Sequence, residues 1–436
     1  MKIHFIGIGG IGISGLAKYT RFSGHEVSGS DMKATHITQR LIDRGIKVSI
    51  GHDAANIPEG CDLVIHSAII RDTNVEVVEA KRRGIEVLHR RDALLRILKE
   101  KKVYAVCGAH GKSTTTAILA SIMSGSAIIG AESKDFGSNV RYDGSTDVML
   151  FEADESDGSF LNSNPYCSIV TNAEPEHMEY YHYNLDEFHN AYRRFVEMAP
   201  VRVINAEDPF MATLTCDAIR LYPSKDITNI AYILLDDEPY TRFTLKNMGE
   251  FEVWGFGEHI AMDASLAILA AAQTMSVAAI RANLLHFKGI KKRFDVIFKG
   301  SDRVIIDDYA HHPTEIKATM ESLKTYAALK GFERIVAIWQ PHKYSRTIDN
   351  LDAFVACFEG CDELVILPVW AASEEPREID FEGRFGHYNL TMCDKLHRAG
   401  DTIETLKNEN VLKTYDRDLI VGFGAGDLTY QLRGTK

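Results

Sequence analysis

One segment of the chain combines glycines, a lysine and hydroxyl side chains in the spacing of a phosphate-binding loop. It is CGAHGKSTTT, residues 107–116, and it follows the apolar run VYAV. In such loops backbone N–H groups surround the phosphates, the lysine reaches the terminal phosphates, and the hydroxyl group can bind Mg²⁺. Val106 stands where the full Walker pattern has its first glycine. The segment still predicts an ATP site formed by Gly108, Ala109, His110, Gly111, Lys112, Ser113 and Thr114.

A second glycine-rich loop stands near the N-terminus. In FIGIGGIG, residues 5–12, the pattern G-x-G-x-x-G is formed by Gly7, Gly9 and Gly12. Glycines at these positions allow a tight turn and let the backbone approach a phosphate, and Asp31 ends the next predicted strand, where it could bind a ribose hydroxyl. Alone, the pattern fits a dinucleotide site, a nucleotide-sugar site or a structural turn. Two phosphate loops in one chain imply either two nucleotides or one nucleotide and a nucleotide-linked substrate.

Acidic side chains follow the next apolar run. Glu152 lies in FEADESD with three more acidic residues close behind it, and His177 in NAEPEHM ends the following predicted strand. Because the carboxyl ends of parallel strands meet at one edge of a sheet, Glu152 and His177 could lie near the ATP phosphates. Carboxylate oxygens suit Mg²⁺. A solvated acidic loop is the alternative interpretation.

Two later segments place histidine, aromatic and charged side chains directly after apolar strands. They are IIDDYAHHPTE, residues 305–315, and WQPHKYSRT, residues 339–347. A lone histidine in such a position is more often an ordinary surface or core residue. Two clusters at two strand ends favour a substrate site.

The elements that must position these side chains alternate between strands and helices. Predicted strands cover 2–7, 25–31, 47–50, 62–67 and 86–88, with helical stretches between them. This alternation predicts an α/β fold with mostly parallel sheets. The same alternation starts again before the ATP loop and once more after about residue 295. We therefore predict a Rossmann-like N-terminal domain (1–99), a central P-loop ATPase-like domain (100–295) and a Rossmann-like C-terminal domain (296–436).

Composition agrees with a multidomain enzyme. The chain has 436 residues, 45% of them hydrophobic, and a net charge of -12. This charge argues against nucleic-acid binding, so anionic ligands must meet local basic clusters such as Lys81 to Arg83, Arg90 with Arg91, and Lys291 to Arg293. Seven cysteines without a CxxC pair indicate a reducing cytoplasm. The glycine-interrupted N-terminus predicts neither a signal peptide nor a membrane span.

Together these motifs resemble the Mur ligases. HFIGIGGIGISGLA, GAHGKSTTT, EADESD, TNAEPEHM, GIKKRFD, DDYAHHPTE, QPHKYSRT and GAGD occur in the family's order and cover nearly the whole chain. The resemblance implies three domains that bind a UDP-linked sugar, ATP with Mg²⁺, and an incoming amino acid. It is strongest to the family member that joins L-alanine to UDP-N-acetylmuramate through an acyl phosphate, releasing ADP. It also implies a cytoplasmic monomer or homodimer without nucleic-acid or membrane partners.

The resemblance assigns roles to individual residues. The UDP portion is expected to be bound by Gly7, Gly9, Gly10, Gly12, Asp31 and Ser67. ATP is expected to contact the loop 108–114 together with His259, Arg293 and Asp308. Mg²⁺ is expected on Ser113, Glu152 and His177. The amino acid is expected near Tyr309, His311, His342, Lys343 and Arg346. The expected catalytic residues are Lys112, His177, Asp308, His311 and Arg346.

The chain departs from the family pattern at two places that matter for ligands. In HIAMD, residues 259–263, Ile260 and Asp263 replace the asparagines of the family's adenine-binding segment. After the QPH histidine, Lys343 replaces an arginine, which keeps the charge but removes the two-pronged geometry that suits a carboxylate.

Three other functions fit part of the sequence. A nicotinamide-dependent oxidoreductase would explain the first glycine loop but neither the second loop nor the later clusters. A non-catalytic ATP-binding module would bind ATP without forming an amide. Within the family, a murein-peptide ligase that recycles a tripeptide is the nearest alternative.

Overall fold

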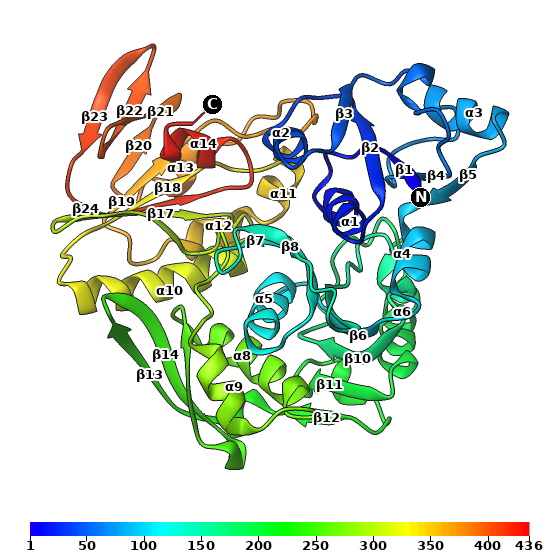
Figure 1. Cartoon of the computed structure of the whole chain (residues 1–436). Coiled ribbons are helices and arrows are strands. Elements are labelled where there is room, and N and C mark those ends of the chain that lie inside the picture. Colours follow the sequence, from blue (N-terminus) through cyan, green and yellow to red (C-terminus); the bar gives the residue numbers. More distant parts are fainter. Residues whose placement is uncertain (436) are drawn as a thin grey trace. The chain divides into compact units, whose positions relative to one another are not determined.

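The computed structural model describes residues 1–435 (Figure 1). It divides into two compact units. The first contains Met1–Thr228, Thr244–Phe251 and Met262–Lys288, and the second contains Asn229–Phe243, Glu252–Ala261 and the chain from Gly289 onward. The chain therefore passes from one unit to the other after residues 228, 243, 251, 261 and 288. The predicted domain boundaries at 99 and 295 stay predictions.

The N-terminal part of the first unit contains a five-stranded parallel sheet in the order β3-β2-β1-β4-β5. This order is typical of a Rossmann-like domain. Its strands are β1 (Lys2–Ile6), β2 (Glu26–Asp31), β3 (Lys47–Ile50), β4 (Leu63–His66) and β5 (Glu86–His89). Its helices are α1 (Ile11–Phe22), α2 (His36–Asp43), α3 (Val75–Arg82) and α4 (Arg90–Leu98). All five predicted strands are confirmed.

The rest of the first unit is built on a seven-stranded sheet in the order β12-β11-β10-β6-β9-β7-β8, antiparallel only between β7 and β8. The strands are β6 (Lys102–Cys107), β7 (Ser126–Ser133), β8 (Ser138–Arg141), β9 (Val148–Glu152), β10 (Pro165–Val170), β11 (Val201–Asn205) and β12 (Ile219–Leu221). The helices are α5 (Lys112–Ile122), α6 (Leu185–Met198), α7 (Pro223–Asp226) and α9 (Val277–Leu284), while α8 (Glu258–Ala271) begins in the second unit.

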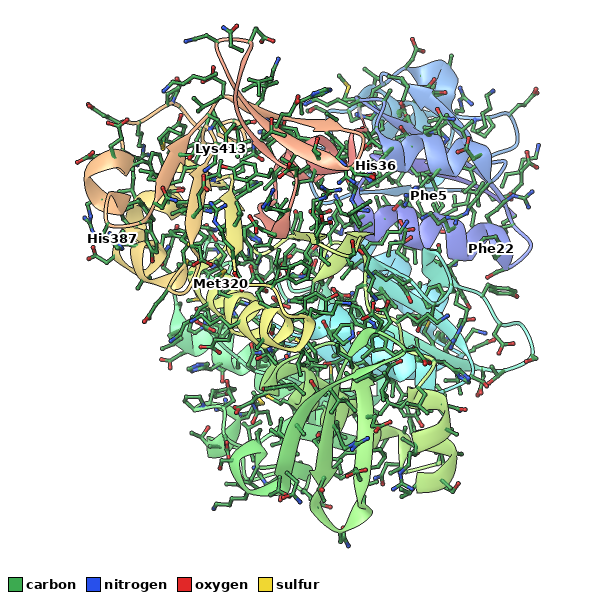
Figure 2. The ribbon with its side chains drawn as sticks, turned by 90° about the vertical axis from the view of Figure 1, so that its left-hand side faces the viewer. Phe5, Phe22, His36, Met320, His387 and Lys413 are labelled. Carbon is green, nitrogen blue, oxygen red and sulfur yellow. The ribbon has the colours of Figure 1, made fainter. Side chains whose placement is uncertain are left out.

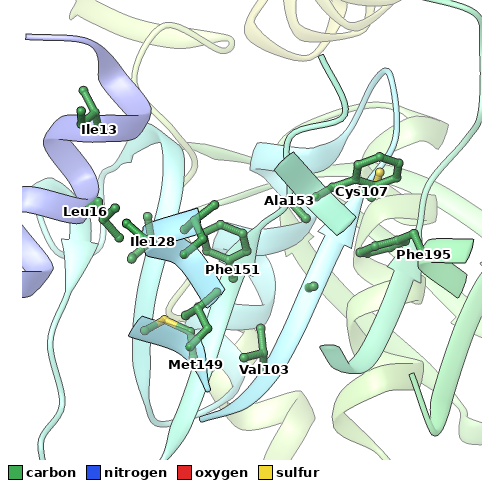
Figure 3. Close-up of a cluster of buried hydrophobic side chains, with 14 of the residues drawn as sticks. Ile13, Leu16, Val103, Cys107, Ile128, Met149, Phe151, Ala153 and Phe195 are labelled. Carbon is green, nitrogen blue, oxygen red and sulfur yellow. The ribbon is translucent and has the colours of Figure 1, made fainter. Parts of the chain in front are cut away.

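One continuous apolar core joins the two sheets of the first unit. Figure 3 shows Ile13 and Leu16 of α1 beside Ile128 of β7 and Phe151 of β9, and all four side chains are buried. Burial of aliphatic and aromatic side chains is the main favourable term in folding. The glycine loop that precedes α1 is therefore fixed against the sheet that carries the second phosphate loop.

The second unit contains a six-stranded sheet in the order β16-β17-β24-β18-β19-β20, parallel except between β16 and β17. Its strands are β16 (Asp295–Lys299), β17 (Arg303–Asp308), β18 (Ile335–Trp339), β19 (Glu363–Ile366), β20 (Leu390–Met392) and β24 (Asp418–Phe423). Its helices are α10 (Pro313–Lys330), α11 (Tyr344–Asp349), α12 (Leu351–Cys357), α13 (Phe381–Phe385) and α14 (Leu428–Arg433). Met320 of α10, labelled in Figure 2, lies in the buried core beside this sheet.

Two small sheets complete the chain. One has the order β13-β14-β15 and consists of Ile227–Leu235, Glu238–Leu245 and Glu250–Trp254. The other is antiparallel and consists of β21 (Lys395–Ala399), β22 (Thr402–Lys407) and β23 (Asn410–Tyr415). The sequence analysis identified neither. The three-domain α/β fold that it predicted is confirmed. Within residues 1–435 no helix has the length and apolar character to cross a membrane.

Candidate active site

The first glycine loop connects β1 to α1 and is held by the end of β2. Gly7 has a φ of +76°, which favours glycine, and a Cβ built there would lie 2.6 Å from Ser67 Oγ. The N–H of Gly9 donates to Asp31 Oδ2 at 2.8 Å. Gly10 is the N-cap of α1 and has no side chain that could cap the helix. The backbone N–H groups of the first turn of α1 therefore have no side-chain acceptor from the N-cap. The structure thus brings together the residues predicted for the UDP portion.

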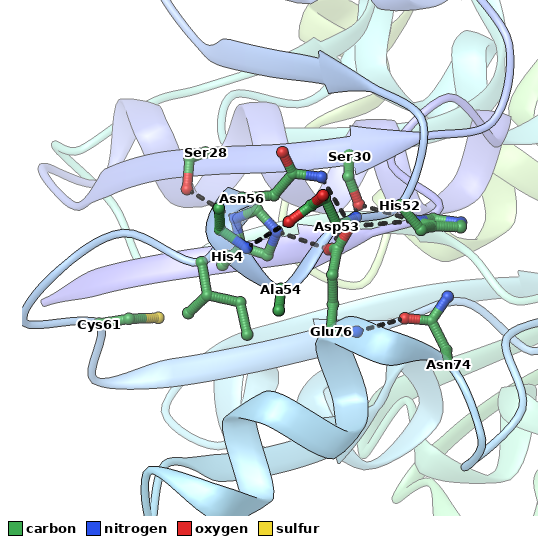
Figure 4. Close-up of polar contacts among 12 residues, drawn as sticks. His4, Ser28, Ser30, His52, Asp53, Ala54, Asn56, Cys61, Asn74 and Glu76 are labelled. Carbon is green, nitrogen blue, oxygen red and sulfur yellow. Dashed lines mark hydrogen bonds and ion pairs between the residues drawn. The ribbon is translucent and has the colours of Figure 1, made fainter.

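A buried polar network around Glu76 includes Ser30, whose backbone is hydrogen-bonded to this loop (Figure 4). The carbonyl of Ser30 accepts from the N–H groups of Gly7 and Ile8 at 2.8 and 3.0 Å, and the Ser30 hydroxyl donates to Glu76 Oε2 at 2.7 Å. The Glu76 carboxylate is fully buried and also pairs with His4 at 3.0 Å. Burial raises the pKa of Glu76, but hydrogen bonds from His4, Asn56 and Ser30 outweigh it and lower that pKa to about 2.

We expect Glu76→Gln to lower the free energy of unfolding by about 3 kcal/mol at pH 7, because the native state lowers the pKa of Glu76 from 4.5 to about 2. Since the folded pKa lies below the ordinary value, this stabilisation is complete above pH 4.5 and is lost as the pH falls toward 2. Urea denaturation of both proteins across this range measures it. Exposed Glu86→Gln is the control, with an expected change within about 0.5 kcal/mol. A pH-independent difference between Glu76→Gln and the wild type would contradict the assignment.

The second loop lies between β6 and α5, as predicted. Gly108 has a φ of +143°, and a Cβ there would lie 2.0 Å from Thr171 Oγ1 and 2.9 Å from the carbonyl of Asn172. Gly111, with a φ of +83°, is the N-cap of α5, and a Cβ there would meet the Asp263 carboxylate at 2.5 Å. The N–H of His110 donates to the Asn172 side chain at 3.2 Å. Ala109 lies between these positions, and Lys112, Ser113 and Thr114 form the first turn of α5.

Lys112 points back into its own loop. Its ammonium donates to the carbonyls of Gly108 and Ala109 at 2.5 and 3.2 Å and to Glu155 Oε1 at 2.9 Å. Glu155 is 1% exposed. Burial raises the pKa of Glu155 to about 7, although Lys112 opposes this shift. Burial lowers the pKa of Lys112, but the Glu155 carboxylate reverses this effect and raises it to about 12, so the lysine is charged at neutral pH.

The predicted metal ligands are partly brought together. Glu152 ends β9 and accepts from the N–H of Gly130 at 2.6 Å. Burial raises the pKa of Glu152, while Lys112 and the nearby Ser113 side chain act to lower it. His177 is exposed in a left-handed conformation with a φ of +53°. Within residues 1–435 no hydrogen bond or ion pair joins its side chain to Ser113 or Glu152.

In the second unit, Asp308 ends β17 and is 3% exposed. Its carboxylate accepts from the N–H groups of Phe294 and Ala310 at 2.9 and 2.8 Å and from the Thr319 hydroxyl at 3.1 Å. Burial raises the pKa of Asp308, and Arg293 lowers it. Both carboxylate oxygens are therefore used to fix the segments that carry Arg293 and the residues after β17.

The predicted amino-acid residues lie together at the ends of β17 and β18. The ring centres of Tyr309 and His311 are 5.4 Å apart, and those of His311 and His342 are 5.8 Å apart. Arg346 Nη1 lies 3.1 Å from His342 Nδ1. Burial, with His311 and Arg346 nearby, lowers the pKa of His342 to about 4, and burial also lowers the pKa of His311. Lys343 has a φ of +69°, and its N–H donates to the Trp370 carbonyl at 2.8 Å.

Glu315, in the first turn of α10, connects two predicted ligand groups. Its Oε1 lies 3.1 Å from Arg293 Nη1, and its Oε2 accepts from the N–H groups of His311 and His312 at 3.0 and 3.3 Å. Arg293 also lies 5.9 Å from the centre of the Tyr309 ring. One carboxylate thus positions the arginine predicted for ATP and the histidine predicted for the amino acid.

Comparison with known proteins assigns the chain to a family. Three family models match it: "Mur ligase family, catalytic domain" over residues 2–102, "Mur ligase middle domain" over 106–271, and "Mur ligase, glutamate ligase domain" over 292–426. These ranges contain both glycine loops and the residues Tyr309, His311, His342 and Arg346 at the ends of β17 and β18.

The chain belongs to the Mur ligase family.

Two curated relatives of this Mur ligase share one name. A "UDP-N-acetylmuramate--L-alanine ligase" of Campylobacter curvus (strain 525.92) is 54% identical over 433 residues, which cover 99% of each chain. A relative of the same name from Helicobacter pylori (strain P12) is 54% identical and covers 99% of this chain and 96% of its own. The crystal structure of a UDP-N-acetylmuramate-alanine ligase from Thermotoga maritima has a TM-score of 0.81 at 26% identity and covers 100% of this chain and 98% of that one.

The loop at 107–116 of the Mur ligase suits a nucleotide phosphate and Mg²⁺. Gly108 and Gly111 have no side chain at positions where a Cβ would collide with neighbouring atoms, and Lys112 adds a positive charge on a side chain that is 15% exposed. Ser113 and Glu152 offer adjacent oxygen donors, which are the ligands that Mg²⁺ prefers. His259 belongs to the second unit: it lies in the first turn of α8, and a Cβ built on Gly257 would lie 2.4 Å from its ring. The residues present therefore fit both groups.

Some residues of these sites were missed or left without a role. Glu155 was noted as an acidic neighbour of Glu152, but its pairing with Lys112 requires two loops to meet. Asp263 was noted as a departure from the family pattern, and its contact with Gly111 is tertiary. Glu315 had a local signal, since a glutamate three residues after the N-cap of a helix is typical of a capping box.

Proposed function

We propose that this Mur ligase joins L-alanine to the carboxylate of UDP-N-acetylmuramate and converts ATP to ADP and phosphate, as a step in peptidoglycan precursor synthesis. The observation that carries the proposal is the presence of two phosphate loops of different geometry in one unit, 5–12 and 107–116. One loop suits a nucleotide-linked substrate and the other suits ATP. The names of relatives 54% identical across the chain support the specific substrates.

The chemistry requires activation of a carboxylate, which is a poor electrophile. Transfer of a phosphoryl group from ATP to the muramate carboxylate produces an acyl phosphate with a good leaving group. Lys112 would stabilise the negative charge of the transferring phosphoryl group, a task of positioning and electrostatics. When bound by Ser113 and Glu152, with His177 as the further proposed ligand, Mg²⁺ would supply charge neutralisation at the same phosphates.

The second unit would supply the amino acid. Arg346 would bind the alanine carboxylate, with Lys343 as a second positive charge and Tyr309 and His342 beside it. Because burial lowers the pKa of His311, the imidazole is neutral at pH 7 and could accept a proton from the alanine ammonium. The free amine would then attack the acyl phosphate and release phosphate. Arg293 and His259 would contact ATP, and Asp308 would hold Arg293 in place.

The UDP portion would be bound in the first unit. Gly7, Gly9, Gly10 and Gly12 would leave room for the diphosphate at the start of α1, with Asp31 and Ser67 at the edge of the loop. Seven free cysteine thiols support the proposed location in the reducing cytoplasm. A monomer or homodimer is proposed for the active form.

Phosphate release and product mass test the proposed function directly. We expect Mg-ATP, UDP-N-acetylmuramate and L-alanine together to release phosphate and to give a product heavier by one alanine residue. Other amino acids, glycine included, should give less. Turnover only with L-alanyl-γ-D-glutamyl-meso-diaminopimelate would instead indicate a murein-peptide ligase. ATP binding without amide formation from any of these substrates would instead indicate a non-catalytic ATP-binding module.

A further inference from the structure

A cavity of about 400 Å³ lies over the first glycine loop. Its walls come from the loop and α1, from the residues after β4, from α4, from β7 and from the end of β9. All these elements belong to the first unit. The volume falls within the range of small-molecule sites, which is about 300–1,000 Å³. The cavity is thus large enough for part of a nucleotide-linked substrate.

Arg90 reaches this cavity from the first position of α4. Its Nη2 donates to Asp157 Oδ2 at 2.8 Å and to Ser159 Oγ at 3.0 Å, so two acceptors fix the plane of the guanidinium. The other end of the group lies over α1, where a Cβ built on Gly12 would be 2.6 Å from Nη1. Within residues 1–435 this Nη1 has no hydrogen-bond partner, and the side chain is 15% exposed.

Arg90 differs in charge from the other ionisable residues that line the cavity. Its acidic lining residues are Asp31, Glu152, Asp154 and Asp157. Arg90 is the one lysine or arginine among the lining residues. Without Arg90, a diphosphate placed at the start of α1 would meet backbone N–H groups, the Ser67 hydroxyl and carboxylates, and no positively charged side chain of the lining. Because Asp157 and Ser159 occupy Nη2, the free Nη1 is the nitrogen of Arg90 that can donate to a phosphate oxygen, and the guanidinium keeps its positive charge at any ordinary pH.

We propose that Arg90 binds the diphosphate of the UDP-linked substrate, together with the backbone N–H groups at the start of α1. This assignment rests on the proposed function for the identity of the substrate. It also gives Gly12 a reason beyond turn geometry, since a side chain there would displace the guanidinium from the helix end. Asp157 and Ser159 then act as positioning residues for Arg90.

Calorimetric titration of UDP and of uridine separates a phosphate contact from a general loss of the site. In Arg90→Met we expect the Kd for UDP to rise about 10- to 100-fold, while the Kd for uridine stays within about 2-fold. Arg90→Lys keeps the charge, but one ammonium cannot both bond Asp157 and Ser159 and hold a second nitrogen over Gly12, so its Kd for UDP should rise about 3- to 10-fold. Arg91→Met is the matched control, because Arg91 is the next residue of α4 and is exposed, and it should bind both ligands normally.

Two results would overturn the assignment. One is an unchanged Kd for UDP in Arg90→Met or Arg90→Lys. The other is an equal weakening of UDP and uridine, which would indicate a structural role. If Arg90→Met does not fold, the Kd values of Arg90→Lys for UDP and for uridine test the assignment in the same way. Failure of the proposed function is distinguishable, because wild-type protein would then bind UDP without making product from UDP-N-acetylmuramate.

Discussion

Replacing Lys112 with alanine is expected to lower kcat for the ligation by about a thousandfold, because the variant loses the positive charge that the proposed mechanism uses to stabilise the transferring phosphoryl group. The Kd of the UDP-linked substrate should not change, since the first glycine loop is a separate site. Phosphate release measures the rate, and calorimetry measures the Kd of the UDP-linked substrate and the Kd of ATP. Without its cation Glu155 becomes neutral at pH 7, because burial alone raises its pKa. The fold should therefore survive the change.

Lys99→Ala is the matched control for this experiment. Lys99 is exposed at the end of α4, outside both glycine loops. It should retain the wild-type rate and melting temperature. Near-normal turnover of Lys112→Ala, with a melting curve like that of the control, would exclude the phosphate role of the lysine.

Gly108→Ala is expected to disrupt the ATP loop most severely. The φ of +143° disfavours any side chain, and the new Cβ would lie 2.9 and 3.0 Å from the backbone carbonyl and N–H of Asn172. Backbone atoms cannot rotate away as a flexible side chain can. We expect the free energy of unfolding to fall by about 1–3 kcal/mol more than in a strain-only control. ATP binding should become undetectable by calorimetry.

Gly24→Ala isolates the conformational part of this effect. Gly24 also has a positive φ, +89°, but a Cβ there would have nothing within 4 Å. Its expected cost is about 1–2 kcal/mol from the left-handed conformation alone. Urea denaturation compares the two variants. Equal losses of stability, or normal ATP binding by Gly108→Ala, would show that Thr171 and Asn172 do not crowd the loop.

Local sequence patterns predicted the elements that carry the sites. Apolar runs such as KIHFI and IVAIW form buried parallel strands because helices cover both faces of these sheets, and glycines next to them mark the loops. The antiparallel pair of β7 and β8 had no comparable signal, because Gly130 and Glu132 interrupt the first strand and SNVR is short and polar. The same holds for β21 to β23, which have no continuous apolar run and, in β23, expose Val411 and Leu412.

Contacts between distant segments explain what the sequence could not predict. Lys112 and Glu155 are 43 positions apart, and Arg90 and Asp157 are 67 positions apart. No periodicity relates such residues, so the ion pair in the ATP loop and the arginine above Gly12 follow only from tertiary structure. The residue types at the strand ends, in contrast, were sufficient to predict the cluster of Tyr309, His311 and His342. The individual ligand roles stay predictions.

The path of the chain has a consequence for its synthesis on the ribosome. The first unit has all its segments once residue 288 has been made, whereas the second unit has only 229–243 and 252–261 at that moment. These two segments depend on residues made later: the Phe256 carbonyl accepts from the Ser322 hydroxyl at 3.0 Å, and Glu238 pairs with Lys299 at 3.2 Å. The nascent chain must therefore carry the apolar side chains of Tyr232, Leu234 and Phe256 without the rest of their core until the C-terminal part emerges.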